Sequence, residues 1–328
     1  MTGLPNLPIA GVAPTAAPSG KPRLPEWFKV KPPGGQAYAA IKQALRERGL
    51  STVCEEARCP NLAECWGGGS MPGQEGARKI GTATIMVMGG TCTRGCRFCS
   101  VPTGKPGMLD GEEPRKASET VGLMGVGYVV ITSVDRDDLP DGGADHFGRV
   151  IERCKADHPE LLVEVLTPDF QGDEGALRRI VAAKPDVVAH NVETVRRLTP
   201  AVRDRRAGYD QTLQVLRDYK RLGARFTKTS IMLGLGETQV EVEECLRDLR
   251  AAGVDIVTFG QYLRPTQEAR HLAVTEFVHP RQFDAYAAMA RAMGFLYVAS
   301  GPLVRSSYKA GELFLEGMIR GANPRVAQ

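Results

Sequence analysis

Three cysteines fall within eight positions of one glycine-rich stretch, GGTCTRGCRFCS, residues 89–100. They are Cys92, Cys96 and Cys99, with the spacing Cys-x3-Cys-x2-Cys. Thiolates at this density bind zinc or an iron–sulfur cluster. A closed structural zinc site needs a fourth Cys or His, and the nearest histidine, His146, is far along the chain. Three thiolates on a four-iron cluster leave one iron open, and an open iron can bind a substrate.

A second set of three cysteines stands upstream, in CEEARCPNLAECW. Cys54, Cys59 and Cys65 have the spacing Cys-x4-Cys-x5-Cys, again without a fourth thiol close by. The other two cysteines, Cys154 and Cys245, lie in helix-like segments, where a lone cysteine is usually a small core residue. The sequence therefore holds two incomplete ligand sets.

The segments after residue 80 must position this chemistry, and they alternate between strand-like and helix-like patterns. A helix-like segment near 280–293 precedes a last apolar run at 294–302, which would close or edge the sheet. Such alternation predicts an α/β fold, a partial parallel (β/α)6 TIM-like barrel. The cysteine loop directly follows the first strand, at the end where such barrels carry their active sites. The expected strands are 82–89, 127–134, 161–168, 186–193, 226–234 and 255–262, and the helices between them are near 115–125, 143–157, 173–183, 208–222 and 238–252.

The chain divides into four parts. Residues 1–35 are rich in Pro, Gly and Ala and are expected to be flexible, because they bury too little apolar surface to offset backbone ordering. Within them, Trp27 and Phe28 are candidates for docking on the barrel. Residues 36–80 form an N-terminal extension with a helix at about 36–48 and the second cysteine set. Residues 81–300 form the barrel, and 301–328 form a C-terminal extension.

Composition argues against several classes of protein. A formal charge of +4 over 328 residues is too mild to indicate a nucleic-acid partner. No run of 18 apolar residues predicts a membrane span, and the N-terminus lacks the pattern of a secretory signal. We therefore expect a cytoplasmic protein, without membrane attachment, whose cysteines are reduced thiols or metal ligands.

The two triplets together resemble the lipoyl synthase family of the radical S-adenosylmethionine (SAM) superfamily. The aromatic Phe98 directly before the last cysteine of the first triplet is part of that likeness. The resemblance extends from about residue 25 to about 315. It is carried further by ITSVDRDDLPDGGADHF (131–147), HNVETV (190–195), VRDRRAGYDQTL (202–213), KTSIMLGLGE (228–237), GQYLRPT (260–266) and SGPLVRSSYKAGE (300–312).

This resemblance implies a sulfurtransferase with two 4Fe-4S clusters and SAM as co-substrate. The open iron of the first cluster would chelate SAM, and one electron would cleave SAM to a radical that removes an unactivated hydrogen. Two sulfur atoms would then be inserted at C6 and C8 of an octanoyl chain on the lysine of a lipoyl carrier domain. The second, auxiliary cluster would be the sulfur donor. Its fourth ligand in the family is a serine of an Arg-Ser-Ser-Tyr motif, here Ser307, with Ser306 as the alternative.

Polar residues at or near strand ends are candidates for the SAM pocket as a set, although any one of them alone is better explained as a capping or hydrogen-bonding residue. They are Ser133, Asp135, Asn191, Glu193 and Lys228, with Phe98 from the cysteine loop. The basic run RDRR, 203–206, is either a solvated face, a docking site for an acidic carrier domain, or a salt bridge near the SAM carboxylate.

The resemblance also implies partners. They are octanoylated carrier domains of 2-oxoacid dehydrogenase E2 subunits and the glycine cleavage H protein, an electron donor such as ferredoxin or flavodoxin, and an iron–sulfur carrier protein for cluster repair. A monomer is expected. Competing interpretations are a tRNA methylthiolating enzyme, biotin synthase, or a non-catalytic cluster carrier. The first would need an RNA-binding domain, the second would lack Cys54, Cys59 and Cys65, and the third would need closed clusters.

Overall fold

A computed structural model describes residues 24–28, 43, 51–52 and 82–306 of the chain. The second cysteine set (Cys54, Cys59 and Cys65), Ser307, and the helix expected over 36–48, apart from Gln43, lie outside the described residues. The barrel predicted for residues 81–300 is described over almost its whole length.

The barrel is a single sheet whose strands follow one another in chain order. β2 to β8 pair in parallel, and β1 (Ser51–Thr52) pairs antiparallel with β2 at the edge. Within the described residues β8 pairs with β7 alone, so the sheet stays open and the predicted partial barrel is confirmed. The parallel strands are β2 (Thr82–Val87), β3 (Tyr128–Ser133), β4 (Leu162–Leu166), β5 (Val187–Ala189), β6 (Phe226–Leu233), β7 (Ile256–Gln261) and β8 (Tyr297–Gly301).

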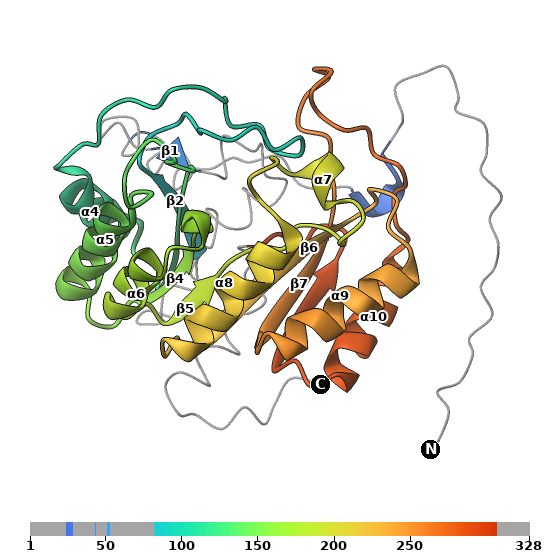
Figure 1. The fold of residues 1–328 in the computed structure, drawn as a ribbon. Helices are drawn as coiled ribbons and strands as arrows, with labels where there is room; N and C mark the ends of the chain where they lie inside the picture. The colour runs from blue at the N-terminus through green and yellow to red at the C-terminus, as the bar shows by residue number, and fades with distance from the viewer. Residues whose placement is uncertain (1–23, 29–42, 44–50, 53–81, 307–328) are drawn as a thin grey trace, which may run out of the picture.

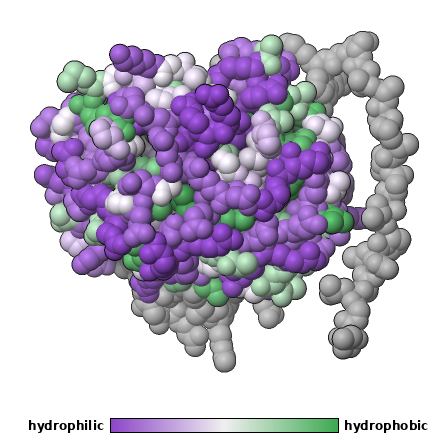
Figure 2. All heavy atoms as spheres, in the orientation of Figure 1, coloured by the Kyte–Doolittle hydropathy of each residue, from purple (hydrophilic) through white to green (hydrophobic). Residues whose placement is uncertain are grey.

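Six long helices connect successive parallel strands and lie side by side along one face of the sheet (Figure 1). Their outer surfaces carry mostly hydrophilic residues (Figure 2). The short α7 (Thr199–Val202) and the 3-10 turn η2 (Phe170–Gly172) were not predicted, because so few residues hold no readable periodicity. The long helices are α4 (Glu113–Met124), α5 (Ala144–Asp157), α6 (Glu174–Ala182), α8 (Tyr209–Arg221), α9 (Gln239–Ala251) and α10 (Pro280–Ala292).

The strands are apolar on both faces because both faces are buried. On β3, Val129 and Ile131 pack into the core shared with α4, α5 and α6, while Tyr128 and Val130 belong to a separate cluster on the barrel's inner side. Side chains alternate along a strand, so neighbouring positions serve different cores. The same packing buries Cys154 and Cys245 in the cores beside their helices, as expected for small apolar residues.

The barrel interior is layered from its floor to its open end. Tyr128, Leu162 and Phe226 contribute to the apolar floor. Two positions further along β4 and β6, Glu164 accepts hydrogen bonds from the Lys228 ammonium at 2.7 and 2.8 Å. The hydroxyl of Tyr128 donates to the same carboxylate at 2.5 Å. A satisfied buried charge pair therefore separates the floor from the space above.

Part of the N-terminal segment docks beside this scaffold, as the aromatic residues predicted. The 3-10 turn η1 (Glu26–Phe28) buries Phe28, whose ring meets Phe277 edge-on with centroids 5.7 Å apart. Trp27 meets the ring of His279 in the same manner at 5.2 Å. No helix of the described residues has the length and apolar content to cross a membrane.

Candidate cluster and cofactor site

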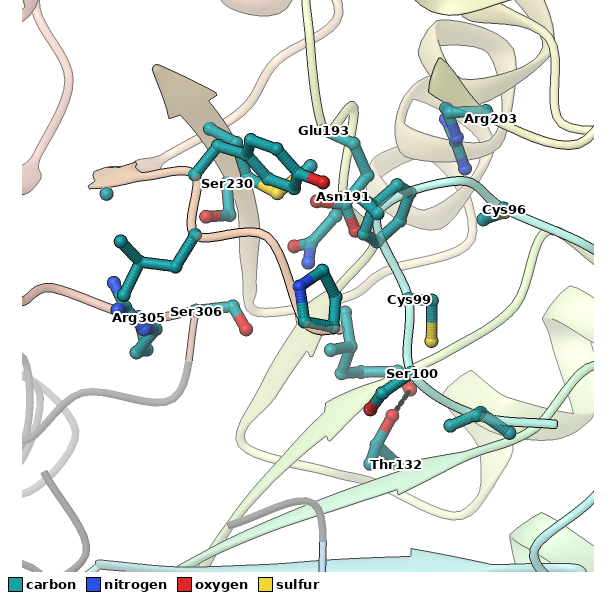
Figure 3. A pocket seen from close by; sticks show the side chains of 18 of the residues that line it. Cys96, Cys99, Ser100, Thr132, Asn191, Glu193, Arg203, Ser230, Arg305 and Ser306 are labelled. Carbon is teal, nitrogen blue, oxygen red and sulfur yellow. Dashed lines mark hydrogen bonds between the residues drawn. The ribbon is translucent and has the colours of Figure 1, made fainter. Parts of the chain in front are cut away.

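A cavity of about 980 Å³ occupies the open end of the barrel, at the carboxyl ends of the strands. All three cysteines of the first triplet line it, together with five of the six residues predicted for the SAM pocket: Phe98, Ser133, Asp135, Asn191 and Glu193. Figure 3 shows the cysteine loop on one side of this cavity and Arg305 and Ser306 on the opposite side. The topology thus brings together residues that are more than 200 positions apart.

The cysteine loop leaves β2 through a fixed backbone turn at Met88. This residue has φ 67°, a left-handed conformation that non-glycine residues rarely adopt. Its amide donates to both carboxylate oxygens of Glu113 at 3.0 Å, and its carbonyl accepts from Arg136 at 3.4 Å. His146, 2.6 Å from Glu113, holds that carboxylate in turn. His146 is therefore a structural residue and not a ligand of the first cysteine set.

Arg94, between the first two cysteines of the loop, is a buried anchor. Its guanidinium donates to Asp169 at 2.8 and 2.7 Å and to Asp137 at 3.3, 3.0 and 2.7 Å. Asp135 lies 3.4 Å away. Burial opposes ionisation of Asp169, but hydrogen bonds and charge from Arg94 outweigh it and lower the pKa of that carboxyl. The loop is therefore tied to the ends of β3 and β4.

Two further loops hold the cysteine loop from other sides. Asp204, in the β5–α8 connection, accepts from the Gly95 amide at 2.9 Å, and Arg206 donates to the Thr93 carbonyl at 2.7 Å. His271, in the β7–α10 connection, lies 2.9 Å from the Cys99 carbonyl and 2.7 Å from the Thr266 hydroxyl. The cysteine loop is thus fixed by groups from four separate connections, those that follow β3, β4, β5 and β7.

Backbone amides point at the cysteine sulfurs. Cys92 Sγ accepts from the amides of Arg94 and Asp135 at 3.4 and 3.3 Å, and Cys96 Sγ accepts from the Asp204 amide at 3.3 Å. Such N–H donors stabilise thiolate ligands and tune the potential of an iron–sulfur cluster. Burial raises the pKa of Cys92 to about 12 and that of Cys96 to about 11, so iron must displace a proton from each thiol.

The donor set fits a four-iron cluster better than a single metal ion. Within the described part of the chain, no three His, Cys, Asp or Glu side chains converge on one ion. A cubane cluster does not require such convergence, because each thiolate binds a different iron.

Orphaned polar atoms mark where a polar ligand fits beside the cysteines. Ser133 Oγ, Asn191 Oδ1, Arg203 Nε and Arg264 Nε are all buried and have no hydrogen-bond partner. All four side chains line the same cavity as the thiols. Buried polar atoms without partners are rare and costly, so their concentration here indicates a bound polar molecule. The two guanidinium donors fit a carboxylate, and the amide and hydroxyl oxygens fit an ammonium group, both of which SAM carries.

Glu193 faces this cavity from a strained backbone. It has φ 66° and is held by hydrogen bonds from its amide to the Ser230 carbonyl and from the Met232 amide to its own carbonyl. Burial raises the pKa of its carboxyl. Strain of this kind at a cavity wall costs stability and is typical of ligand sites.

Lys228 is the one predicted pocket residue that the structure does not bring to the cavity. It faces the barrel interior as its place on β6 requires, but it lies in the layer below and is bound to Glu164. The sequence did not reveal this, because the partner carboxylate is 64 positions away.

The C-terminal segment after β8 crosses over the end of β7. A Cβ at Gly260 would lie 2.2 Å from the carbonyl oxygen of Val304, so only glycine permits this approach. Arg305 and Ser306 thereby line the cavity opposite the cysteines. Ser307, the next residue, lies outside the described residues.

Sequence reasoning missed three residues of this site: Arg94, Arg264 and His271. Arg203 belongs to the basic run RDRR, for which a salt bridge near the SAM carboxylate is one of the alternatives, and it is the only arginine of that run that lines the cavity. Arg94 and His271 carry no local signal, because they bond to distant segments, and Arg264 gains its role only from its place at the cavity.

Family comparisons agree with this site. The model of the radical SAM superfamily matches residues 86–249, which include the first cysteine set. A model for the N-terminal domain of lipoyl synthase matches residues 15–59. The lipoyl synthase of Anaeromyxobacter sp. (strain Fw109-5) is 56% identical over 304 residues, which are 92% of this chain and 98% of that protein.

The chain belongs to the lipoyl synthase family. The lipoyl synthase of Halobacterium salinarum (strain ATCC 700922) is 54% identical over 91% of this chain and 93% of that protein. The mitochondrial lipoyl synthase of Laccaria bicolor is 53% identical over 93% of this chain and 78% of that protein. As a lipoyl synthase, the protein is a sulfur-inserting radical SAM enzyme that uses a 4Fe-4S cluster and SAM and carries a second, auxiliary cluster.

Solved structures agree on the fold alone. The FeFe-hydrogenase maturase from Carboxydothermus hydrogenoformans superposes with a TM-score of 0.54 at 11% identity, covering 73% of this chain and 66% of that one. A second maturase structure gives a TM-score of 0.55 at 13% identity, with coverage of 78% and 65%. These two solved structures therefore share the partial-barrel fold of this chain.

Proposed function

We propose that Cys92, Cys96 and Cys99 hold the SAM-binding cluster of this lipoyl synthase, with its open iron facing the cavity. The observation that carries this is the shared cavity. Three thiols with amide donors on two of their sulfurs lie beside four orphaned polar side chains. When bound, the cluster and SAM supply the one-electron chemistry that removes hydrogen from an unactivated C–H bond.

The chain's own residues bind and orient SAM in this proposal. Asn191 and Ser133 offer their unpaired oxygens, and Arg203 offers its unpaired Nε to the SAM carboxylate. Glu193, half-buried near Asn191, faces the cationic portion of the ligand. Phe98 packs with Tyr262 and Leu235 behind the cysteine loop and excludes water from it.

The auxiliary cluster is proposed to lie across the cavity from the first one. Cys54, Cys59 and Cys65 would supply three ligands and Ser307 the fourth, with Ser306 as the alternative. Support comes from Ser306, which lines the cavity opposite the cysteine loop. An alkoxide suits iron–sulfur chemistry less well than a thiolate, so it would release its iron more readily, as a sulfur donor requires.

The substrate is an octanoyl chain amide-linked to a lysine of a carrier domain, functionalised at C6 and C8. Apolar side chains between the two proposed clusters would hold its methylene groups: Leu24, Met86, Leu166, Met232, Val274 and Phe277. The carrier itself stays outside. It would be an E2 subunit of a 2-oxoacid dehydrogenase or the glycine cleavage H protein.

An electron donor such as ferredoxin or flavodoxin would reduce the SAM cluster, and an iron–sulfur carrier would rebuild the auxiliary one. The enzyme would act as a monomer in the cytoplasm, with residues 36–80 as the auxiliary-cluster extension and 301–328 as the serine-bearing one.

Cysteine variants test the two ligand sets. We would reconstitute the wild type, Cys54→Ala, Cys99→Ala and the core control Cys245→Ala anaerobically, then measure iron and reductive SAM cleavage. The proposal predicts about half the iron in each ligand variant, with SAM cleavage kept in Cys54→Ala and lost in Cys99→Ala. An iron content equal to that of the wild type in Cys99→Ala would contradict the assignment. So would a result in which Cys54→Ala loses SAM cleavage and Cys99→Ala keeps it.

A further inference from the structure

The tip of the cysteine loop is exposed at Gly95, next to Cys96. It lies between two segments that it contacts directly. The Thr103 hydroxyl donates to the Arg94 carbonyl at 3.0 Å, and the Gly95 amide donates to Asp204 at 2.9 Å. Figure 1 shows this loop, in teal, running to α7, where the Arg97 amide donates to the Val202 carbonyl at 2.9 Å. The surface over the proposed SAM cluster is therefore built from these three segments.

Basic side chains surround this tip. Arg97, Lys105, Arg205 and Arg206 are all exposed, and we call them the basic rim. The acidic partners of Arg206 lie underneath, because Asp204 and Asp137 each expose only 13% of their side chains. In the described part of the chain, Lys105 and Arg205 have no hydrogen bond or ion pair. The charge that this surface presents to solvent is thus positive.

The basic rim lies outside the cavity. None of its four side chains lines the cavity that holds the cysteines, whereas Arg203, from the same basic run as Arg205 and Arg206, does. A partner bound on the rim therefore contacts the outer side of the cysteine loop and not the cavity lining, where an acylated lysine arm would have to lie. It can, however, approach the backbone that separates Cys96 from solvent. This geometry favours a partner that delivers an electron over one that delivers a substrate.

We propose that the basic rim is the docking surface for an acidic one-electron donor protein that reduces the SAM cluster. The proposal rests on the proposed function, which places that cluster on Cys92, Cys96 and Cys99. The donor loses one electron and the cluster gains one, with no bond formed or broken in this step. Opposite charges steer such an encounter and raise its rate, an effect that salt screens.

The test compares a protein donor with a small reductant. The rim variant is Lys105→Glu/Arg205→Glu, since neither side chain supports the loop. The matched control is Lys184→Glu/Arg217→Glu, a lysine before β5 and an arginine on α8, both exposed. After equal cluster loading, stopped-flow absorbance follows cluster reduction by reduced flavodoxin or by excess dithionite.

With flavodoxin at low salt, we expect the rim variant to be reduced at least about tenfold more slowly than the wild type and the control. The difference should shrink as salt rises, and dithionite should reduce all three proteins alike. Equal rates with flavodoxin would overturn the proposal, and so would equal slowing with both reductants. Loss of sulfur insertion into an intact carrier protein under dithionite would overturn it in favour of carrier docking. A wild type that cleaves no SAM with dithionite would instead refute the proposed function.

Discussion

The guanidinium of Arg94 and the carboxylate of Asp169 form two hydrogen bonds, at 2.7 and 2.8 Å, across 75 positions of sequence. The two side chains expose only 3% and 1% of their surface. One belongs to the cysteine loop and the other follows β4. Their pairing fixes the loop to the barrel, so the arrangement of the thiols depends on a residue that binds no iron.

Arg94→Lys keeps the charge but loses the planar fork that reaches Asp169 and Asp137 together. A buried carboxylate left unpaired costs about 3 kcal/mol or more, so the free energy of unfolding should fall by about that amount. Guanidinium unfolding of the anaerobic protein measures it, and iron content in a Cys54→Ala background reports the SAM cluster alone. The control is Arg178→Lys, because Arg178 forms an exposed ion pair with Glu174. This variant should change the free energy of unfolding by less than about 0.5 kcal/mol. Equal effects of the two variants would contradict the anchor role.

Gly260→Ala should disturb the C-terminal segment selectively. The added methyl group would meet the Val304 carbonyl oxygen at 2.2 Å, so the segment leading to Ser306 must move. We expect loss of the auxiliary cluster's share of the iron with SAM cleavage retained, and a stability loss of about 1–3 kcal/mol. Gly111→Ala is the control, since its Cβ would meet nothing within 4 Å. Full iron content in Gly260→Ala would refute this coupling.

Lys228→Met should destabilise the fold without weakening SAM binding. It leaves the buried Glu164 carboxylate without its cation and with the Tyr128 hydroxyl as its remaining donor, which costs about 3–5 kcal/mol. Adding Glu164→Gln should recover part of that loss, since an amide carries no charge. Thermal unfolding and the KM for SAM measure the two effects. A stable Lys228→Met protein with a strongly raised KM would show that the lysine contacts SAM after all.

The buried ring of His190 should make the protein less stable in mild acid. Burial, followed by the charge of Arg203, lowers its pKa from 6.5 to about 4, so the folded state keeps the ring neutral. The unfolded chain takes up a proton below about pH 6.5, so this contribution is full above that pH and is lost as pH falls toward 4. Between pH 7 and 5 the wild type should lose about 2 kcal/mol more than His190→Gln. Parallel pH profiles in denaturant titrations would rule out this role.

Much of the fold could be read from the sequence because buried parallel strands are apolar on both faces. The departures have local causes. The segment expected as a strand over 186–193 is β5 only at Val187–Ala189. Beyond it, the Val192 amide donates to the Thr229 hydroxyl instead of a backbone carbonyl, and pairing with β6 returns only as a single bridge between Glu193 and Ile231. The helix expected from 115 begins at Glu113, since Pro114 is tolerated in a first turn.

The cysteine loop could be predicted because its ligands are close in sequence and of one rare type. Arg94 and His271 could not, because an arginine or histidine gains meaning only from its partner. Those partners, Asp169 and the Cys99 carbonyl, are 75 and 172 positions away and meet only in the fold. The prediction for Lys228 was wrong for the same reason, because its partner Glu164 lies on another strand, 64 positions away in the sequence.

The most direct test of the account is the mass of an octanoyl-lysine peptide after anaerobic incubation with the doubly loaded enzyme, SAM and dithionite. The account predicts a peptide that has gained the mass of two sulfur atoms, because each of two C–H bonds becomes C–SH, with about two SAM molecules cleaved for each product. It also predicts an unchanged peptide with Cys54→Ala, although that variant still cleaves SAM. SAM cleavage by the fully loaded wild type without any gain of sulfur would contradict the assignment of lipoyl synthase activity to this site.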